Sequence, residues 1–396
     1  MGTDAALRRV QETKVEGKTA LVRVDYNVPL RGREITDDTR IRASMPTLST
    51  LIDGGAKVVL ATHLGRPDGT IVDELRLDPV ANRLSEVLER DVRKLDDCVG
   101  DDVADAIEAG GPGDVFLLEN LRFHAGEEEN DDAFAKALAR PADLYVNDAF
   151  ATVHRSHAST FGVTRFLPSY AGHLMQTEVD ALSRLLHDPE RPYIAIVGGK
   201  KAESKLGALR DLVERVDGIL VGGGVAYTFL KALGASVGDS IVDSSLLDEV
   251  ASVMKRAEAR GIEIALPVDA LIARRLERGA ETMISDARAI PEGWAGFDIG
   301  PKTVELFQTK IDAARTLVWT GPMGAFEVEP FAEGTAGVAE AVAGSGAYSV
   351  IGGGETGDAV ARTGFAHAVS YVSTGGGACL ALLRGKSLPA LDALRG

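Results

Sequence analysis

The sequence predicts an α/β protein made of two doubly wound, Rossmann-like parallel sheets joined by a helical hinge. Three observations support this fold class. The chain has 396 residues, which exceeds what one hydrophobic core usually organises. Short apolar strands alternate with helical stretches almost throughout, as in parallel sheets with crossover helices. The strands also fall into two series, with a segment of helical period between them.

The first series of predicted strands lies within the first 150 residues. Amphipathic segments at 78–92 and 131–141 separate some of these strands and are expected to form helices. The apolar runs of the series are TALVRVDYNV, AKVVLATHL, DVFLLENLRF and ADLYVNDAF. Their order predicts one parallel sheet with helices between its strands.

The second series begins at residue 193. Its apolar runs are YIAIVGG, GILVGGG, IEIALPV, TLVWTGP, YSVIGGG and AVSYVST, and nearly all end in glycine, proline or a small polar residue. The segment 166–188 lies between the two series, and its latter half is periodic and apolar enough for a helix. We therefore expect a rigid helical hinge over 173–188 rather than a flexible linker.

The composition excludes several classes of function. Hydrophobic residues make up 45% and charged residues 26% of the chain, as in an ordinary soluble globular protein. A net charge of −16 argues against nucleic acid as a partner. No apolar run approaches the length of a membrane span, and the opening MGTDAALRRV does not resemble a signal peptide. Cys98 and Cys379 lack a C-x-x-C partner, which suits a reducing cytoplasm.

The acidic composition also suggests where the protein works. Arginine clearly outnumbers lysine, and alanine, glycine and valine are abundant. A carboxylate-rich surface stays hydrated in concentrated salt, so we expect a salt-adapted (halophilic, archaeal-like) source. An ordinary soluble acidic enzyme is the alternative.

Basic side chains follow the strands of the first series. Ligands of open α/β sheets bind beyond the carboxyl ends of the strands, where these side chains are expected to lie. Guanidinium groups bind carboxylate and phosphate through paired hydrogen bonds, so the cluster predicts a small polyanionic substrate. The candidate residues are Asp25, Asn27, Arg40, His63, Arg66, Arg122 and Arg155. A metal site built from His63, His154 and His157 is the weaker alternative, because no cysteine accompanies them and H-x-x-H alone is a poor zinc signature.

Glycines and two lysines follow the strands of the second series. GGKKAESK (198–205) follows a strand and opens a predicted helix, but it lacks the spacing of a P-loop. Lys201 and Lys205 are four residues apart, and we expect them on one face of that helix, next to phosphate. The glycines of 222–224 allow close approach to a nucleotide, and Glu327 is a candidate to accept hydrogen bonds from a ribose.

The stretch GGGETG (352–357) matches the spacing of a dinucleotide-binding turn, which raises the possibility of a nicotinamide enzyme. Such a turn requires an acidic residue at the end of the next strand, and here that strand ends in Ser373 and Thr374. The stretch is better interpreted as a turn that contacts phosphate. In this interpretation Thr356 caps the helix, and Glu355 reaches a phosphate-bound Mg²⁺.

Taken together, these strings resemble the phosphoglycerate kinase family. VRVDYNVP, THLGRP, LLENLRFH, NDAFATVHRSHAS, IVGGKKAESKL, GGGVAYTFLK, VWTGPMGAFE, GGGETG and STGGGA occur in the family's order, from about residue 20 to the end. The resemblance implies phosphoryl transfer between 1,3-bisphosphoglycerate and Mg·ADP, giving 3-phosphoglycerate and ATP, in a monomeric cytoplasmic enzyme. It also implies that the C-terminal tail folds back onto the first domain. The expected boundaries are 1–172 with about 384–396 for the 3-phosphoglycerate domain, and 189–383 for the nucleotide domain.

The resemblance assigns roles to the candidate residues. The seven candidates of the first half match the family's 3-phosphoglycerate site, and Arg40, Lys201 and Lys205 are expected to neutralise the transferring phosphoryl group. The expected nucleotide ligands are Lys201, Lys205, Gly222, Gly223, Glu327, Gly353, Gly354, Glu355 and Thr356, with Glu355 also the metal ligand. The two halves of the site require domain closure about the hinge.

Two positions depart from the family pattern. Glu355 stands where many members have Asp, and Thr320 stands where many have Asn. Glu keeps the carboxylate and Thr keeps a hydroxyl, so we expect activity with an altered metal preference. The remaining alternatives are an NAD-dependent dehydrogenase and a non-catalytic nucleotide-binding protein.

Overall fold

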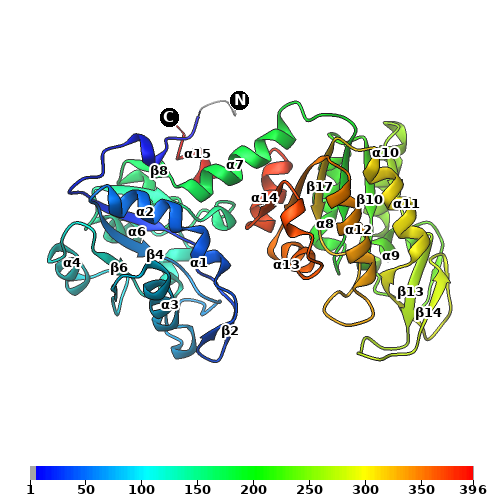
Figure 1. Cartoon of the computed structure of the whole chain (residues 1–396), viewed down its shortest axis with the longest axis horizontal. Helices are drawn as coiled ribbons and strands as arrows, with labels where there is room; N and C mark the ends of the chain where they lie inside the picture. Colours follow the sequence, from blue (N-terminus) through cyan, green and yellow to red (C-terminus); the bar gives the residue numbers. More distant parts are fainter. Residues whose placement is uncertain (1–5, 396) are drawn as a thin grey trace. The chain divides into compact units, whose positions relative to one another are not determined.

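The computed structural model describes residues 6–395, and the chain divides into two compact units. Unit 1 extends to Asp180 and includes the C-terminal segment from Ser387, whereas unit 2 comprises Ala181–Lys386. Helix α7 (His173–Leu186, green in Figure 1) passes through the boundary, in the segment where a helix was predicted. The predicted fold class, two α/β units each built on a parallel sheet, is confirmed.

Unit 1 is built on six parallel strands in the spatial order β5–β6–β4–β1–β7–β8. The strands are β1 (Thr19–Arg23), β4 (Lys57–Ala61), β5 (Val92–Lys94), β6 (Val115–Leu117), β7 (Leu144–Asn147) and β8 (Ser169–Ala171). The central strands are apolar on both faces: Ala20 and Val22 of β1 belong to one hydrophobic cluster, and Leu21 is buried on the other face. Strands with two buried faces form near-continuous apolar runs, which is why the sequence predicted β1, β4, β6 and β7.

Two strands of this sheet were not predicted. Strand β5 has three residues and buries only Val92, and the amphipathic segment 78–92 hid its start. Strand β8 is equally short. The helices of unit 1 are α1 (Thr39–Ala43), α2 (Met45–Asp53), α3 (Asp78–Leu88), α4 (Asp101–Glu108), α5 (Ala125–Glu128), α6 (Asp132–Ala139) and α15 (Pro389–Asp392). Short 3₁₀ turns are η1 (Val10–Glu12), η2 (Asp73–Leu75), η3 (Leu121–Phe123), η4 (Phe150–Thr152) and η5 (Gly162–Arg165), and a small hairpin joins β2 (Leu30–Arg31) to β3 (Glu34–Ile35).

The two ends of the described chain meet in unit 1 (Figure 1). Leu7 forms an isolated β-bridge with Arg395, and the backbone N–H of Arg8 donates to the carbonyl of Leu394 at 2.8 Å. Leu391 and Leu394, in and just after α15, are buried. The C-terminal segment therefore adds apolar contacts to the unit that the N-terminal half forms.

Unit 2 is built on a second sheet of six parallel strands, in the order β12–β10–β9–β17–β18–β19. The strands are β9 (Tyr193–Val197), β10 (Gly218–Val221), β12 (Glu263–Ala265), β17 (Thr316–Thr320), β18 (Tyr348–Gly352) and β19 (Tyr371–Ser373). All six were predicted, and numbered along the chain they have the order 3-2-1-4-5-6 of the Rossmann fold.

Two groups of helices surround this sheet. Helices α8, α9, α10 and α14 contact one another in one group, and α11, α12 and α13 form the other. Their bounds are α8 (Glu203–Leu212), α9 (Gly223–Ala232), α10 (Leu247–Ala259), α11 (Pro301–Asp312), α12 (Glu333–Gly344), α13 (Gly354–Arg362) and α14 (Gly376–Leu383), with 3₁₀ turns η6 (Ser244–Leu246) and η7 (Ala366–Ala368). This is the two-sided covering that a doubly wound sheet requires.

Unit 2 also contains an antiparallel sheet that the sequence did not predict. Its strands are β13 (Asp269–Ala273), β14 (Thr282–Asp286) and β16 (Ala295–Ile299), in the order β14–β13–β16, and β11 (Ser236–Val237) pairs with β15 (Ala289–Ile290). Strand β14 is largely exposed, so it lacks the apolar run that marks the other strands. Within the described residues, no helix combines the length and the apolar character needed to cross a membrane.

Each main sheet has a switch point next to its first strand. In unit 1, β1 lies between β4 and β7, and in unit 2, β9 lies between β10 and β17. At such a point the connections from two neighbouring strands run in opposite directions. This creates a crevice at the carboxyl ends of the strands. The candidate residues of both halves follow these strands.

Candidate active site

The centre of the basic cluster in unit 1 is His63, which follows β4 and is buried. Burial lowers its pKa well below the ordinary value, and four guanidinium groups lower it further. These groups belong to Arg23, Arg122, Arg155 and Arg40. The charges of three predicted arginines therefore act on one histidine. The fourth, Arg23, was not predicted.

Arg23 is a member of the basic cluster that the sequence analysis missed. It ends β1, is buried, and donates from Nε to Ser159 Oγ at 2.8 Å and from one Nη to the Val24 carbonyl. The other Nη lies 3.2 Å from His63 Nδ1. An arginine inside the apolar run LVRVD was the signal, because a charged side chain is rarely buried in a strand without a partner.

The contact with Arg23 fixes the tautomer of His63. A guanidinium donates hydrogen bonds and cannot accept them, so Nδ1 of His63 is the acceptor and carries no proton. The lowered pKa agrees with a neutral ring. His63 Nδ1 also lies 3.9 Å from Asp25 Oδ1, but a neutral ring forms no ion pair there. The remaining hydrogen is on Nε2, which can donate to an anionic ligand.

Asp25 and Arg40 are joined directly. Asp25 Oδ2 accepts a hydrogen bond from Arg40 Nη1, from the first turn of α1. Arg40 was expected at the start of a helix, and the structure confirms that position. Its side chain is 31% exposed, so the guanidinium is partly open to a ligand while Asp25 fixes its direction.

The loop after β4 contains Gly65 and Arg66, and its backbone is contacted by Asn27 and Arg122. Asn27 Oδ1 accepts from the Gly65 N–H at 2.9 Å, and Arg122 Nη1 donates to the Gly65 carbonyl at 2.8 Å. Arg122 is buried and pairs with Glu128 at 3.1 Å. Arg66 follows Gly65 and is exposed. Asn27 and Arg122 therefore shape the loop that presents Arg66.

The histidines near Arg155 have structural partners. Arg155 Nε donates to His154 Nε2 at 3.3 Å, and burial lowers the pKa of His154. His157 Nδ1 lies 3.7 Å from the buried carboxylate of Glu127, which also accepts from Ser159 Oγ at 2.6 Å. Although burial opposes it, hydrogen bonds from His157 and Ser159 and the charge of Arg23 lower the pKa of Glu127. Through Ser159, these contacts hold Arg23 in its buried position beside His63.

In unit 2, Lys205 lies in the first turn of α8 and points to the end of β17. Its Nζ donates to Thr320 Oγ1 at 2.9 Å. Burial lowers the pKa of Lys205, and the nearby charge of Glu355 opposes this effect. Lys205 is thus held between β17 and the turn before α13, at the switch point of the sheet.

The prediction that Lys201 and Lys205 share a helical face is wrong. Helix α8 begins at Glu203, so Lys201 lies before it, and its side chain is exposed. The glycine turn causes the difference: Gly199 has a φ of +100° and carries the chain away from β9 before the helix can begin. Lys201 is a loop residue near the same strand end.

The prediction that Thr356 caps its helix is also wrong. Helix α13 begins at Gly354 with Gly353 as its N-cap, and that cap has no side-chain hydrogen bond. Thr356 lies inside the first turn, and its Oγ1 accepts from the Gly321 N–H at 2.7 Å and donates to the Gly352 carbonyl at 3.3 Å. Thr356 therefore ties the turns after β17 and β18 together from a buried position.

The glycines of unit 2 fall into two kinds. A Cβ on Gly223 would lie 2.8 Å from the backbone of Gly199, so that position is small because two turns pack together. Gly222 forms the N-cap of α9 beside it. A Cβ on Gly354 meets nothing within 4 Å, so the backbone there is open to a ligand. Gly353, with a φ of +107°, is the N-cap of α13, so the first N–H groups of this helix lie at the same turn.

The two predicted acidic ligands are accessible. Glu327 is exposed in the turn after β17, and Glu355 is exposed in the first turn of α13. Mg²⁺ in phosphate sites usually takes one or two carboxylates and obtains its other ligands from phosphate and water. An exposed Glu355 beside an open helix N-terminus fits that kind of shared coordination.

The fold and these side chains define a class: an α/β protein of two Rossmann-like units with basic side chains gathered at the strand ends. The model of the family described as phosphoglycerate kinase matches residues 10–386. The phosphoglycerate kinase of Dictyoglomus turgidum is 49% identical over 387 residues, covering 98% of both chains. That of Rubrobacter xylanophilus is 51% identical, also over 387 residues and 98% of both chains.

Solved structures agree with the sequence comparison. The phosphoglycerate kinase of Coxiella burnetii superimposes with a TM-score of 0.86 at 38% identity, covering 98% of this chain and 99% of that one. The enzyme of Pyrococcus horikoshii has a TM-score of 0.87 at 35% identity, with 98% of each chain covered. The chain belongs to the phosphoglycerate kinase family. It is a kinase that transfers a phosphoryl group reversibly between 1,3-bisphosphoglycerate and ADP, as the sequence predicted.

Proposed function

We propose that unit 1 holds the phosphoglycerate and unit 2 holds the nucleotide in this reaction. The observation that carries the assignment is the basic cluster around His63. Arg23 contacts this ring at 3.2 Å, Asp25 lies between it and Arg40, and the charges of Arg122 and Arg155 act on it. An acidic chain that gathers four cations at one switch point provides a site for a small polyanion. Asp25, Asn27 and Arg66 complete the substrate site, and the open turn at Gly354 with Lys205 receives the nucleotide phosphates.

Phosphoryl transfer needs positioning and charge neutralisation more than covalent help from the protein. In the proposed mechanism Arg40 supplies one cation to the transferring group, and Lys201 and Lys205 supply two more. The backbone N–H groups at Gly353 and Gly354 share the charge of the nucleotide phosphates. No general base is required, because the reacting carboxylate and phosphate oxygens are already anionic.

Glu355 is the proposed Mg²⁺ ligand. When bound, the metal would neutralise phosphate charge. Glu355 and the amine of Lys205 act on each other electrostatically. The carboxylate therefore offsets part of the positive charge of Lys205 and would be available to hold the metal. Glu327 is the proposed partner of the ribose, with Gly222 and Gly223 forming the adjacent turn.

Turnover in this proposal requires closure of the two units about α7, because each carries only half of the reacting groups. Small-angle scattering tests the idea. The radius of gyration should fall when 3-phosphoglycerate and Mg·ATP are bound together and stay close to the ligand-free value with either alone. An unchanged radius in the ternary complex would contradict hinge closure.

The assignment of the function is tested by a coupled assay with 3-phosphoglycerate, ATP and Mg²⁺. Turnover that requires all three supports a phosphoglycerate kinase and rejects a non-catalytic nucleotide-binding protein. Binding of NAD instead of ADP, with no turnover, would support the dehydrogenase alternative. Measuring ADP and NAD affinity on the same preparation separates an inactive sample from a wrong assignment.

Three further properties belong to the proposal. The protein works in the cytoplasm, as its two cysteines without C-x-x-C partners indicate, and it acts as a monomer. The net charge of −16 reflects adaptation to concentrated salt. The archaeal-like source stays a prediction from composition.

A further inference from the structure

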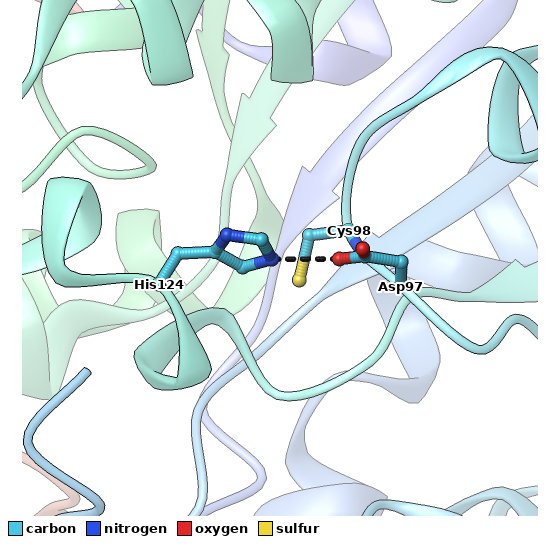
Figure 2. Close-up of side chains that lie close together, drawn as sticks. All are labelled: Asp97, Cys98 and His124. Atoms are coloured by element: carbon cyan, nitrogen blue, oxygen red, sulfur yellow. Dashed lines mark hydrogen bonds and ion pairs between the residues drawn. The ribbon is translucent and has the colours of Figure 1, made fainter. Parts of the chain in front are cut away.

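Unit 1 contains a cluster of three side chains, outside the basic cluster around His63, whose types can bind a metal. Asp97 and Cys98 lie in the loop between β5 and α4, and His124 directly follows η3. One ligand atom from each of the three lies within 4.8 Å of the other two. Figure 2 shows the imidazole and the carboxylate approaching each other, with the sulfur of Cys98 beside the line that joins them.

The contacts within the cluster separate two possible kinds of chemistry. His124 Nε2 lies 2.6 Å from Asp97 Oδ1, and the Cys98 sulfur lies on the same side of the ring (Figure 2). In a nucleophilic triad the acid and the thiol contact opposite nitrogens of the imidazole. Here both face one nitrogen, which is the arrangement of ligands around a shared cation.

The donor set is that of a thiophilic divalent metal. Zinc binds thiolate sulfur at about 2.3 Å and imidazole nitrogen or carboxylate oxygen at about 2.0–2.2 Å, which places donors of one tetrahedron roughly 3.3–3.7 Å apart. The side chains of His124 and Asp97 are 31% and 54% exposed. Asp97, the more exposed of the two, therefore has space to rotate from its present contact into that geometry, with a metal replacing the hydrogen bond.

The surroundings of the cluster orient one ligand and place a carboxylate beside the thiol. The thiol of Cys98 is buried and lies in the field of the carboxylates of Asp97, Glu127 and Glu119, with Lys94 as the opposing cation. Lys94 is already paired with Glu119 at 2.7 Å. The imidazole ring of His124 is held in place because it stacks on the ring of Phe134, with ring centroids 4.9 Å apart. The ring of one ligand is thus oriented. Lys94 and Arg76 neutralise Glu119, so the carboxylate that acts most on the thiol is that of Asp97.

We propose that Cys98, His124 and Asp97 bind a thiophilic divalent cation of the Zn²⁺ class, with a fourth position open to water. The thiol at present donates to the Glu119 carbonyl at 2.9 Å. On metal binding the sulfur exchanges its proton for the metal, and the proton is released to solvent. The metal is distinct from the Mg²⁺ proposed in unit 2, because it needs no nucleotide and is bound through sulfur.

The metal would cross-link two segments of unit 1 that lie near the basic cluster around His63. The metal joins the loop after β5 to the segment that follows β6, and Arg122 lies two residues before His124 in that segment. The expected consequence is greater thermal stability with metal bound, without a requirement for metal in turnover.

Titration of metal-free, full-length protein with Co²⁺ in the absence of nucleotide tests the proposal. A thiolate ligand gives a sulfur-to-cobalt charge-transfer band in the near ultraviolet, and a four-coordinate site gives intense visible bands. Both should appear at one equivalent of Co²⁺ and disappear when Zn²⁺ is added. Cys98→Ser should abolish the charge-transfer band, and His124→Gln should weaken Co²⁺ binding by at least about tenfold.

Cys379→Ser is the matched control, because it changes the other cysteine of the chain, in unit 2, and should keep the full spectrum. If Cys98→Ser unfolds, as circular dichroism would reveal, the His124→Gln titration still decides. Absence of a charge-transfer band in the wild type would overturn the proposal, as would an identical band in Cys98→Ser or unchanged affinity in a folded His124→Gln.

Discussion

Lys205 Nζ and Thr320 Oγ1 form a hydrogen bond of 2.9 Å that joins the first turn of α8 to the end of β17. The resemblance to the family implies Asn at the position that Thr320 occupies. Both residues place a hydrogen-bond acceptor at the strand end, which explains how Thr can be tolerated there. The hydroxyl is therefore expected to orient the lysine amine, in addition to any contact that it makes with nucleotide.

Removing the Thr320 hydroxyl should weaken catalysis modestly. A hydrogen bond of this type contributes about 0.5–1.5 kcal/mol, so Thr320→Val should lower kcat by about two- to tenfold. Thr320→Asn should retain near wild-type turnover, since its side-chain oxygen replaces the hydroxyl as acceptor. Thr316→Val, at the other end of β17, is the matched control for steady-state kinetics. Equal kcat in Thr320→Val and wild type would show that Lys205 is oriented by other contacts.

Arg40→Ala should reduce turnover and leave nucleotide binding intact. Arg40 belongs to unit 1, and loss of one charge-stabilising donor from a reacting group typically costs about 10²–10³ in kcat. ATP affinity, measured by isothermal titration calorimetry, should stay within about twofold of wild type. Arg42→Ala is the control, because Arg42 lies on the same helix but is exposed and paired with Asp38. A parallel loss of ATP affinity in Arg40→Ala would contradict the assigned role.

Glu355→Gln should raise the Mg²⁺ concentration needed for half-maximal activity. The amide keeps the size of the side chain but removes the charge that binds the metal, so an increase of about tenfold or more is expected. Glu355→Asp should change the ratio of Mg²⁺ to Mn²⁺ activity, because its carboxylate reaches one methylene less far. Asp358→Asn, an exposed carboxylate on the same helix, is the control. If the Mg²⁺ dependence of Glu355→Gln equals that of the control, Glu355 is not a metal ligand.

The neutral His63 predicts a contribution to the pH dependence of stability. Its folded-state pKa is lowered well below 6.5, chiefly by burial, so the unfolded chain binds a proton there that the folded chain does not. The folded state therefore loses stability as pH falls below about 6.5, and the loss levels off at the lower folded-state pKa. Denaturant unfolding of wild type and His63→Gln across this range should give a smaller acid-side slope for the variant.

Asp148 is a second buried group whose titration affects stability, so the effect of His63 must be measured as a difference between wild type and His63→Gln. Burial raises the pKa of Asp148 to about 6, which makes its contribution to stability decrease as pH rises through 4–6. The two effects oppose each other in the wild-type profile, and only the difference between wild type and His63→Gln isolates the histidine. His187→Gln, at an exposed histidine, controls for the substitution. Parallel profiles for wild type and His63→Gln would refute the inference.

The sequence revealed the parallel sheets because their central strands are buried on both faces. Runs such as LVR in β1 and YIAIV in β9 leave no alternative periodicity. Strands β5 and β14 were missed for the opposite reason, since each buries few side chains and depends on pairing with distant segments. Arg23 was missed because it lies inside an apolar strand pattern, which predicts only that it belongs to the strand. Its role depends on contacts with Ser159 and His63, which are distant in sequence.

The two corrected predictions in unit 2 share a physical cause. Lys201 was assigned by helical spacing and Thr356 as a helix cap, and both depended on where a helix begins after a glycine at positive φ. The position of a helix start among several glycines depends on packing between turns, such as the contact of Gly223 with Gly199. That contact joins segments from two strands and is invisible in a local pattern.

The net charge of −16 predicts that stability increases with salt concentration. At about 0.1 M salt the Debye length is near 10 Å, so repulsion among surface carboxylates persists, whereas at about 1 M it is near 3 Å and most of that repulsion is screened. Thermal unfolding in increasing KCl should show a rising Tm. A rise that ends by about 1 M indicates screening alone, as in any acidic enzyme, and a continued rise above it indicates salt adaptation. Full stability at low salt, with a flat response to KCl, would exclude adaptation to concentrated salt.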